Sequence, residues 1–302
     1  MNLSQLGRRY RMFLRLIRLT TFLPRNIAYP TAPFFAYFGL SPISHQQQSV
    51  KNAILNAHIP FSNWSIVWKK RLADHAIFCM NAFYHPQFNK QWLQDQVEID
   101  SEFLRGLAKE HKSILLLTYH HPFHHTLFCV LGLLGLQTHV LAAQEESSLL
   151  FSYIGQYIKR LHKGCTKHFN GGGYLFFKND IAGARMAKRV LLKGGVLVSL
   201  NDFMGDETKY PSSRLFNRRV SSPNGSIKLA QRMGVPIVTA IMVRTGNRYR
   251  VILQQIENNQ SEESIMEDYF SFLSNVLLEH PEIWDGWDWF SSFPLIENRE
   301  NT

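Results

Sequence analysis

The chain has few cysteines and no long apolar run. No stretch reaches the roughly 20 apolar residues that a membrane-spanning helix needs, because Arg, Pro or His interrupts each candidate. The three cysteines, Cys79, Cys129 and Cys165, are widely spaced, odd in number and without a CxxC pair. They suggest neither a disulfide framework nor a thiolate zinc site, and they fit a reducing compartment. Arginines recur from Arg8 to Arg18, where a secretory signal needs an uninterrupted apolar stretch, so we expect no cleaved signal.

Phosphate-loop and nucleic-acid motifs are also missing. Gly171–Gly173 is the richest glycine run, yet it has neither the GxxxxGK[ST] pattern nor a GxGxxG after a strand. We interpret it as a loop. Because no recognised nucleic-acid motif accompanies the basic charge, we expect no nucleic-acid partner.

The composition is that of a globular protein with a substantial core. Of 302 residues, 45% are hydrophobic and 19% are charged, and no repeat or linker divides the chain. We therefore expect one integrated domain. The 33 Lys and Arg exceed the 23 Asp and Glu, and the resulting formal charge of +10 favours an anionic partner, either phospholipid or an acidic protein.

The first 20 residues show the pattern of a cationic amphipathic helix. Its arginines recur with 3, 4, 3 spacing at Arg8, Arg11, Arg15 and Arg18. The other side of the same helix holds the apolar residues Leu6, Tyr10, Phe13, Leu14 and Ile17. Such a helix can lie among lipid headgroups, and the nearby Leu3, Leu23 and aromatic segment Phe34–Phe38 favour this membrane contact. The alternative is a helix packed on the domain with solvated arginines.

Two regions differ in pattern. Residues 1–105 look mainly helical and membrane-associating, and residues 106–302 alternate short apolar runs with helical segments. The expected strands are Ser113–Thr118, Thr138–Ala142, Val196–Leu200, Pro236–Val243 and Arg248–Gln254. The expected helices between them are Thr126–Leu136, Ser148–His162, Ile181–Lys193 and Gly225–Met233. This alternation predicts an α/β fold with a largely parallel central sheet flanked by helices, and a site beyond the carboxyl ends of the strands.

Four histidines follow the first of these strands: His120, His121, His124 and His125. A neutral imidazole can accept a proton from an attacking hydroxyl or amine if a partner fixes its tautomer. The i, i+4 pairs also permit metal binding, but the sequence identifies no further ligand, and we expect none. A purely structural role is the third alternative. We favour His120 as a general base and His125 as a further catalytic residue, with His121 and His124 near the substrate.

A second candidate element begins at Gly225, where a turn opens a helix. Backbone N–H groups there can face an anion or a developing oxyanion, and Arg218, Arg219 and Lys228 add positive charge. An ordinary helix start is the alternative. We expect these residues to bind substrate.

Several segments occur in the order found in one protein family. His120 ends the first strand, and Lys193–Asp202 gives a helix end, a strand and an Asn-Asp pair. Leu215–Gly225 and Leu229–Val238 are similar to the family patterns FFGRPxxTPxG and LAxRxGAPVVP, and His280–Phe290 is similar to PEQWxWxHRRF. Over nearly its whole length the chain thus resembles the late acyltransferases of lipid A biosynthesis, in the lysophospholipid acyltransferase superfamily.

The resemblance implies an acyltransferase that takes a fatty acyl group from a thioester of acyl carrier protein or coenzyme A, with no other cofactor. It implies a peripheral location on the cytoplasmic face of a bacterial inner membrane. In the family the catalytic motif is HxxxxE or HxxxxD, whose acid orients the histidine. Here His125 stands at the acid position, so we expect a divergent member whose acceptor is a lipid-like or specialised-metabolite hydroxyl or amine.

The missing acid leaves the partner of His120 open. Asp202 or Asp206, on a loop after another expected strand, are candidates for a substitute carboxylate. A catalytically silent lipid-binding homologue and a metal-dependent hydrolase using the histidine cluster are the alternative functions.

Overall fold

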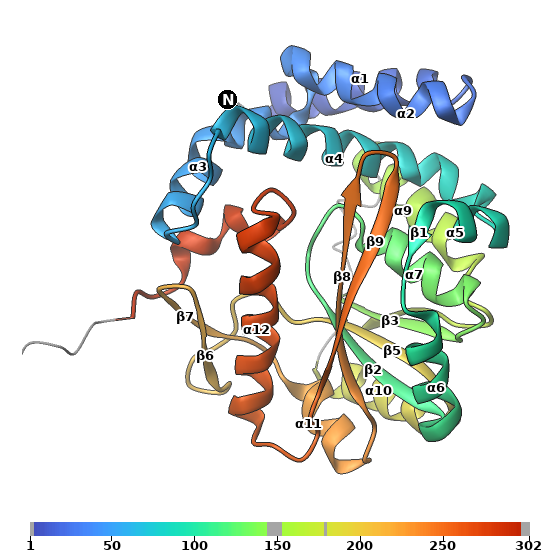
Figure 1. Cartoon of the computed structure of the whole chain (residues 1–302), viewed down its shortest axis with the longest axis vertical. Helices are drawn as coiled ribbons and strands as arrows, with labels where there is room; N and C mark the ends of the chain where they lie inside the picture. Colours follow the sequence, from blue (N-terminus) through green and yellow to red (C-terminus); the bar gives the residue numbers. More distant parts are fainter. Residues whose placement is uncertain (1–2, 144–152, 178–179, 297–302) are drawn as a thin grey trace, which may run out of the picture.

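One seven-stranded sheet forms the centre of the protein, in the order β1-β9-β8-β2-β5-β3-β4 (Figure 1). The computed structural model describes residues 3–143, 153–177 and 180–296, with side chains from Gly7 in the first helix. The strands are β1 (Val97–Glu98), β2 (Ser113–Thr118), β3 (Thr138–Ala143), β4 (Gly173–Phe177), β5 (Gly195–Leu200), β8 (Ile237–Thr245) and β9 (Arg248–Ile256). Neighbouring strands run parallel except for the antiparallel pair β8 and β9. The structure therefore confirms the expected α/β class.

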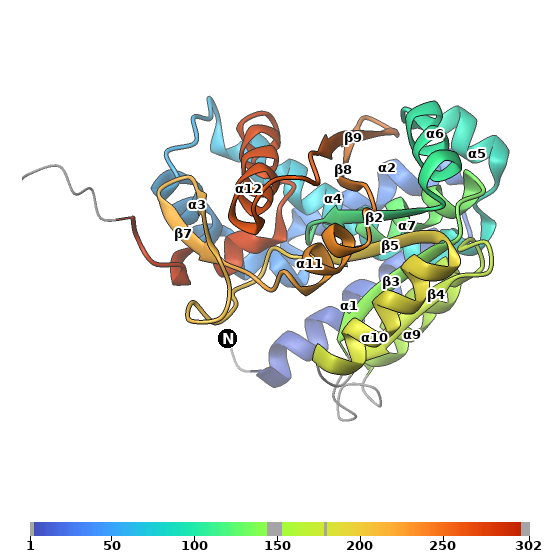
Figure 2. The same ribbon diagram turned by 90° about the horizontal axis from the view of Figure 1, so that it is seen from below.

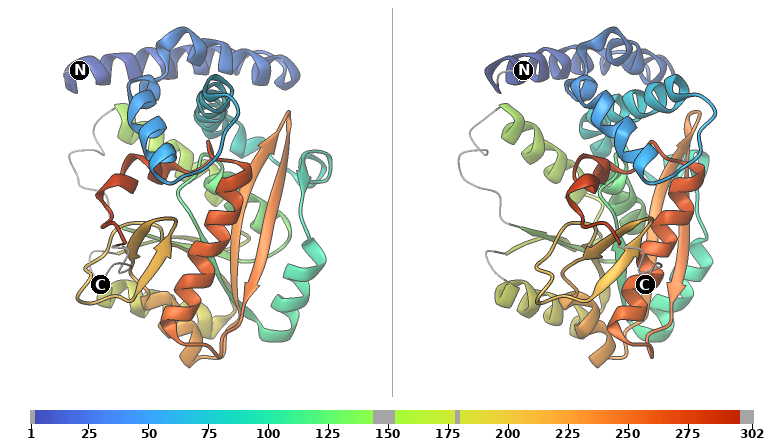
Figure 3. Two further views of the ribbon diagram at one scale, coloured as in Figure 1. Left: turned by 60° about the vertical axis from the view of Figure 1, so that its left-hand side comes forward. Right: turned by 90° about the vertical axis from the view of Figure 1, so that its left-hand side faces the viewer.

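Helices cover both sides of this sheet. They are α6 (Ser101–His111), α7 (His124–Leu133), α9 (Tyr153–Thr166), α10 (Asp180–Lys193), α11 (Gly225–Arg232) and α12 (Glu262–Glu279). Figure 3 shows α9 and α10 on opposite sides of the strands β3 and β4. Helix α7 lies almost entirely inside the protein, which its apolar sequence requires.

The expected strands and helices are present, with ends shifted by a few residues. Of the expected helix Ser148–His162, residues 148–152 lie outside the described residues, and α9 continues to Thr166. The sequence analysis missed β4, whose first residue, Gly173, ends the expected loop. Gly172 has a packing reason to be glycine, because a Cβ there would lie 1.8 Å from the carbonyl oxygen of Thr138 on β3.

The N-terminal helices lie across one end of the sheet. They are α1 (Leu3–Thr20), α2 (Arg25–Phe35), η1 (Ala36–Leu40), η2 (Pro42–Gln46), α3 (Gln47–Asn56), α4 (Trp64–Tyr84), η3 (His85–Gln87) and α5 (Lys90–Gln96). In Figure 1 α4 crosses above the turn between β8 and β9. There the Arg244 guanidinium donates to the buried Asp74 carboxylate at 2.9 Å. This contact joins the helical region to the sheet.

The apolar side of helix α1 packs against the rest of the protein. Phe13, Leu14 and Ile17 are buried, while all four expected arginines are exposed; the side chains of Leu3 and Leu6 lie outside those described. The apolar face therefore packs on the protein and does not itself face lipid. A different apolar set is exposed on α1, α2, η1 and the turn between α1 and α2: Met12, Leu19, Phe22, Leu23, Ile27, Phe34, Tyr37 and Phe38. We call this set, with the exposed α1 arginines, the N-terminal surface. Among the described residues, no helix has the length and hydrophobicity needed to cross a bilayer.

The last part of the chain returns to the end of the sheet that α4 covers. A two-stranded antiparallel ribbon, β6 (Ser212–Leu215) and β7 (Arg218–Ser221), packs beside α12 (Figure 2). The short helices η4 (Asp285–Asp288) and η5 (Phe290–Ser292) follow α12. Buried Arg71 of α4 donates to the carbonyl oxygens of Glu282 at 3.0 Å and Trp284 at 2.8 Å, and so holds this segment in place.

Candidate active site

The register of β2 and β5 brings His120 and Asp202 together. Thr118 pairs with Leu200 at the carboxyl ends of these neighbouring parallel strands. His120 and Asp202 each follow two residues later, so they leave the sheet side by side. His120 Nδ1 lies 2.6 Å from Asp202 Oδ1.

The Asp202 carboxylate is fully buried and accepts three hydrogen bonds. Besides the imidazole, the backbone N–H of His120 and the indole N–H of Trp284 each donate to Oδ2 at 2.8 Å. Burial alone would raise the pKa of Asp202, but the neighbouring imidazole and these donors lower it below its ordinary value. Asp202 is therefore ionised at neutral pH.

This carboxylate sets the tautomer of His120. Because Asp202 can only accept, Nδ1 carries the proton of the neutral ring, and Nε2 has a free lone pair. Burial lowers the pKa of His120, but the Asp202 charge, the hydrogen bond to Asp202 and the Asp285 charge together raise that pKa above its ordinary value. The side chain of His120 is 38% exposed, so its ring remains accessible.

Aromatic side chains contact the His120–Asp202 pair. The ring of Trp289 meets that of His120 edge-on, with centroids 5.8 Å apart, and its indole N–H donates to the Asp202 carbonyl oxygen at 3.1 Å. Phe203 approaches His120 from another direction, with centroids 6.4 Å apart. Trp284 and Trp289 thus position the acid and the imidazole from the C-terminal segment.

His120 lines a cavity of about 880 Å³, within the range typical of small-molecule sites. Its walls come from α7, β3, β4, α10 and the loop after β5. The apolar part of the lining is Phe128, Val140, Leu141, Ala142, Ala143, Phe176, Phe177, Ala184, Ala187, Leu200 and Phe203. A cavity with this lining can hold a hydrocarbon group beside the imidazole.

The N-terminus of α11 forms another part of the same cavity. Asn224, Gly225, Ser226 and Lys228 all line it. The first N–H groups of a helix have no partner within the helix, so they are available to a ligand. Lys228 Nζ pairs with Glu262 at 3.1 Å, which reduces its positive charge toward the cavity. A Cβ added to Gly225 would meet nothing within 4 Å.

The other histidines of the strand end have different surroundings. His124 lines the cavity, and its Nδ1–H donates to the His121 carbonyl oxygen at 2.5 Å. His125 also lines the cavity and pairs with Tyr174, whose hydroxyl lies 2.8 Å from Nδ1. His121 is fully buried, does not line the cavity, and accepts from the backbone N–H of Phe123 at 3.2 Å.

Burial keeps most of these imidazoles neutral. Desolvation, with some help from neighbouring histidines, lowers the pKa of His121 to about 3 and that of His124 well below its ordinary value. His162 of α9, which also lines the cavity, has its pKa lowered to about 4 by burial and by His125. The cavity therefore presents neutral polar groups among its apolar walls.

The two expected arginines lie elsewhere. Arg218 donates to the carbonyl oxygen of Phe293 at 2.6 Å and lies over the ring of Phe290, at 5.5 Å. The backbone of Arg219 donates to the Pro294 carbonyl oxygen at 2.9 Å. Among the described residues that line the cavity, neither arginine is present. Both belong to the contact between β7 and the C-terminal segment.

The sequence analysis did not identify several residues of this site. Asp206, its second candidate acid, is exposed and bonds with Thr208 and Lys209. The missed residues are the positioning tryptophans Trp284 and Trp289 and the cavity residues His162, Tyr174, Ser199 and Asn201. The only sequence signal for the tryptophans is the Trp-rich segment His280–Phe290, which by itself gives no partner for either indole.

No protein-family model matches the chain, and no curated protein matches it at a significant level. The resemblance to the lipid A acyltransferases therefore stays a prediction.

Proposed function

We propose that the protein is an acyltransferase that moves a fatty acyl group from a thioester to a hydroxyl or amine, with His120 as general base. The observation that carries the proposal is one cavity that combines three features. It contains an imidazole oriented by a buried carboxylate, apolar walls, and the N-terminus of α11. A base, an acyl site and an anion site are the parts that acyl transfer requires.

In its neutral form His120 has the tautomer that the reaction needs. Its Nε2 takes the proton of the acceptor hydroxyl or amine as the oxygen or nitrogen attacks the thioester carbonyl carbon. The imidazolium formed is stabilised by the Asp202 charge at 2.6 Å. When the C–S bond breaks, the departing thiolate takes that proton, and the neutral tautomer is restored.

The tetrahedral intermediate carries a negative charge on oxygen. The backbone N–H groups of Gly225 and Ser226, at the start of α11, are the groups that we assign to this oxyanion. The adjacent Lys228 shares its charge with Glu262, so it contributes less than a free cation would.

The acyl chain occupies the apolar part of the cavity in this proposal. Phe128, Val140 and Ala187 are buried residues of α7, β3 and α10 that contribute to its walls. The polar groups of His124, His125 and Tyr174 lie in the same cavity and can bond to a polar group of the acceptor.

Two surface features fit the expected partners. The N-terminal surface places arginines beside exposed aromatic side chains such as Phe22, Phe34 and Phe38, a combination that favours an anionic bilayer. A groove of about 500 Å³ between α1 and α9 is lined by Arg18, Lys159, Arg160, Lys163 and Lys167. This groove suits an acidic acyl carrier protein as donor. We propose a peripheral protein on the cytoplasmic face of a bacterial inner membrane.

The alternative of a silent lipid-binding homologue depended on the missing acid. Asp202, on the loop after β5, supplies a carboxylate to His120, so the lack of an acid at position 125 is no longer a reason to expect an inactive protein. A hydrolase that uses the histidine cluster with a metal has less support, because among the described residues the ligand atoms of these histidines do not form a group of three close enough to share an ion.

The proposal is tested by incubating the protein with acyl carrier protein thioesters, acyl-coenzyme A and candidate acceptors, followed by intact-mass analysis. We expect an acceptor that gains the mass of the acyl group, and a loss of about 10²-fold or more in rate for His120→Ala. Release of free fatty acid without acylated acceptor would instead assign a thioesterase. Equal transfer by the folded His120→Ala variant would remove His120 from the mechanism.

A further inference from the structure

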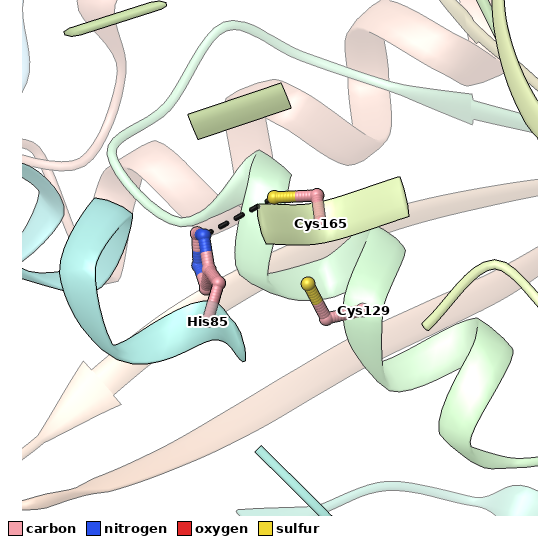
Figure 4. Close-up of side chains that lie close together, drawn as sticks. All are labelled: His85, Cys129 and Cys165. Carbon is pink, nitrogen blue, oxygen red and sulfur yellow. Dashed lines mark hydrogen bonds between the residues drawn. The ribbon is translucent and has the colours of Figure 1, made fainter. Parts of the chain in front are cut away.

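Two of the three cysteines lie close to a histidine in the interior of the protein. His85 of η3, Cys129 of α7 and Cys165 of α9 are fully buried, and their ligand atoms all lie within 4.8 Å of one another. Figure 4 shows the imidazole and both sulfur atoms directed toward one point between the three elements. Among the described residues, this is the one group of three such side chains close enough to share a metal ion.

Hydrogen bonds orient the histidine for metal binding. His85 Nε2 lies 3.1 Å from the hydroxyl of Thr126, which also accepts from the Asn81 amide at 3.1 Å. That hydroxyl can accept the Nε2–H of His85, which leaves Nδ1 with a lone pair directed at Cys165 Sγ, 3.1 Å away. A metal-binding histidine commonly has such an outer partner on its second nitrogen.

The two thiols interact with each other as well as with the histidine. Burial raises the pKa of Cys129, and its hydrogen bond with Cys165 raises it further. Burial also opposes ionisation of Cys165, but Cys129 and His85 lower its pKa well below the ordinary value. The two thiols therefore lie close to each other and to the imidazole, with all three ligand atoms within 4.8 Å.

The charges favour zinc as the occupant. Two thiolates and one neutral imidazole balance the charge of Zn²⁺, which suits a buried position. Two thiolates bound at about 2.3 Å to a tetrahedral zinc ion lie about 3.8 Å apart. The sulfur atoms of Cys129 and Cys165 lie within 4.8 Å of each other, so they need to approach by no more than about 1 Å. The carbonyl oxygen of His125 accepts a hydrogen bond from the Cys165 thiol at 3.7 Å.

We propose that His85, Cys129 and Cys165 form a structural site for a thiophilic metal ion, Zn²⁺ in preference to Cu⁺. The ion would tie the end of α4 to α7 and α9, the helices that supply His124, His125 and His162 to the cavity. It would stabilise the cavity wall and take no part in chemistry at His120. This site is independent of the proposed acyl transfer.

The first test is metal analysis of the purified chain after incubation with excess Zn²⁺ and removal of unbound ion. We expect about one bound ion per chain for the wild type, and less than about a tenth of that for Cys129→Ala and Cys165→Ala. Cys79→Ala is the matched control, because Cys79 is also fully buried yet stands outside the group. It should keep the full metal content.

The second test needs no variant, so it stands even if the alanine variants do not fold. Co²⁺ added to metal-free wild type should give the near-ultraviolet absorption of thiolate coordination, and Zn²⁺ should abolish it. Thermal unfolding should shift upward by several degrees with saturating Zn²⁺ and return with a chelator. Cu⁺ binding with exclusion of Zn²⁺ would change the metal but keep the site.

Three results would overturn the proposal. They are wild type that takes up neither metal, a Cys129–Cys165 disulfide in the purified protein, and loss of metal from Cys79→Ala equal to that from Cys129→Ala.

Discussion

Replacing Asp202 by Asn tests the orientation of His120 with the smallest change in shape. In the wild type, Oδ2 accepts from two fixed N–H groups, the His120 backbone and the Trp284 indole. The Asn oxygen must take that position, because an NH₂ group there would face two donors. The Asn NH₂ group then faces His120 Nδ1 and can only donate to it.

This arrangement reverses the tautomer. Nδ1 becomes the acceptor, Nε2 carries the proton of the neutral ring, and the base is lost on the cavity side. General base catalysis contributes about 10²- to 10⁴-fold, so we expect kcat to fall by that factor, or by about 3–5 kcal/mol in activation free energy. The loss of charge-assisted hydrogen bonds also lowers the free energy of unfolding by about 1–3 kcal/mol.

The assay is acyl transfer measured by intact mass for Asp202→Asn, with urea unfolding to verify that the variant is folded. Asp206→Asn is the matched control, because Asp206 is exposed on the same loop and its side chain bonds only with Thr208 and Lys209 among the contacts described. It should retain full activity. The double variant His120→Ala, Asp202→Asn should be no slower than His120→Ala alone, since the acid acts through the imidazole. A folded Asp202→Asn protein with wild-type kcat would refute the reasoning.

Four further outcomes are expected. Because the Asp202 charge raises the pKa of His120, and the base must be neutral to act, kcat/KM should fall with decreasing pH with an inflection above 6.5; an inflection below 6.5 contradicts this. Because the pKa of Asp202 is lower in the folded than in the unfolded state, the ionised carboxylate stabilises the fold above the unfolded pKa of about 3.9, and this stabilisation is lost as the pH falls through the folded pKa. The difference in unfolding free energy between wild type and Asp202→Asn should therefore shrink below about pH 4. Gly225→Val should fold normally, since a Cβ there meets nothing within 4 Å, but should reduce kcat/KM by about tenfold or more, and unchanged kinetics would remove α11 from the site. Arg15→Gln with Arg18→Gln should weaken binding to vesicles of anionic phospholipid by about 30-fold, at about 1 kcal/mol for each arginine, whereas the exposed Arg232→Gln of α11 should have no effect in the same sedimentation assay.

Periodicity made the sheet predictable. Largely apolar runs such as Ser113–Thr118 are typical of parallel strands covered on both faces, and β2 is buried at every residue. The ribbon of β6 and β7 was not predicted, because its strands have four residues each and exposed arginines. Neither was α12, whose burial depends on packing against β9 and β6 that a local pattern does not reveal.

The candidate site was partly predictable for a related reason. His120 and Asp202 each follow an expected strand, and parallel strands end at the same edge, so their proximity required only that the two strands be neighbours. The local sequence of a strand does not show which strands lie beside it, since β2 pairs with β5 and not with the next strand along the chain. The same limit applies to Trp284, which reaches Asp202 across 82 residues of sequence. Arg218 and Arg219 were assigned from charge alone, and their partners in the C-terminal segment decide their position.

The hydrogen bonds that Trp284 and Trp289 donate to Asp202 have a consequence during synthesis on the ribosome. His120 and Asp202 are translated before the indoles that bond to Asp202, which follow it by 82 and 87 residues. A nascent chain that has not reached Trp284 lacks both indole donors to Asp202. The proposed base is therefore oriented only after these two tryptophans have been added.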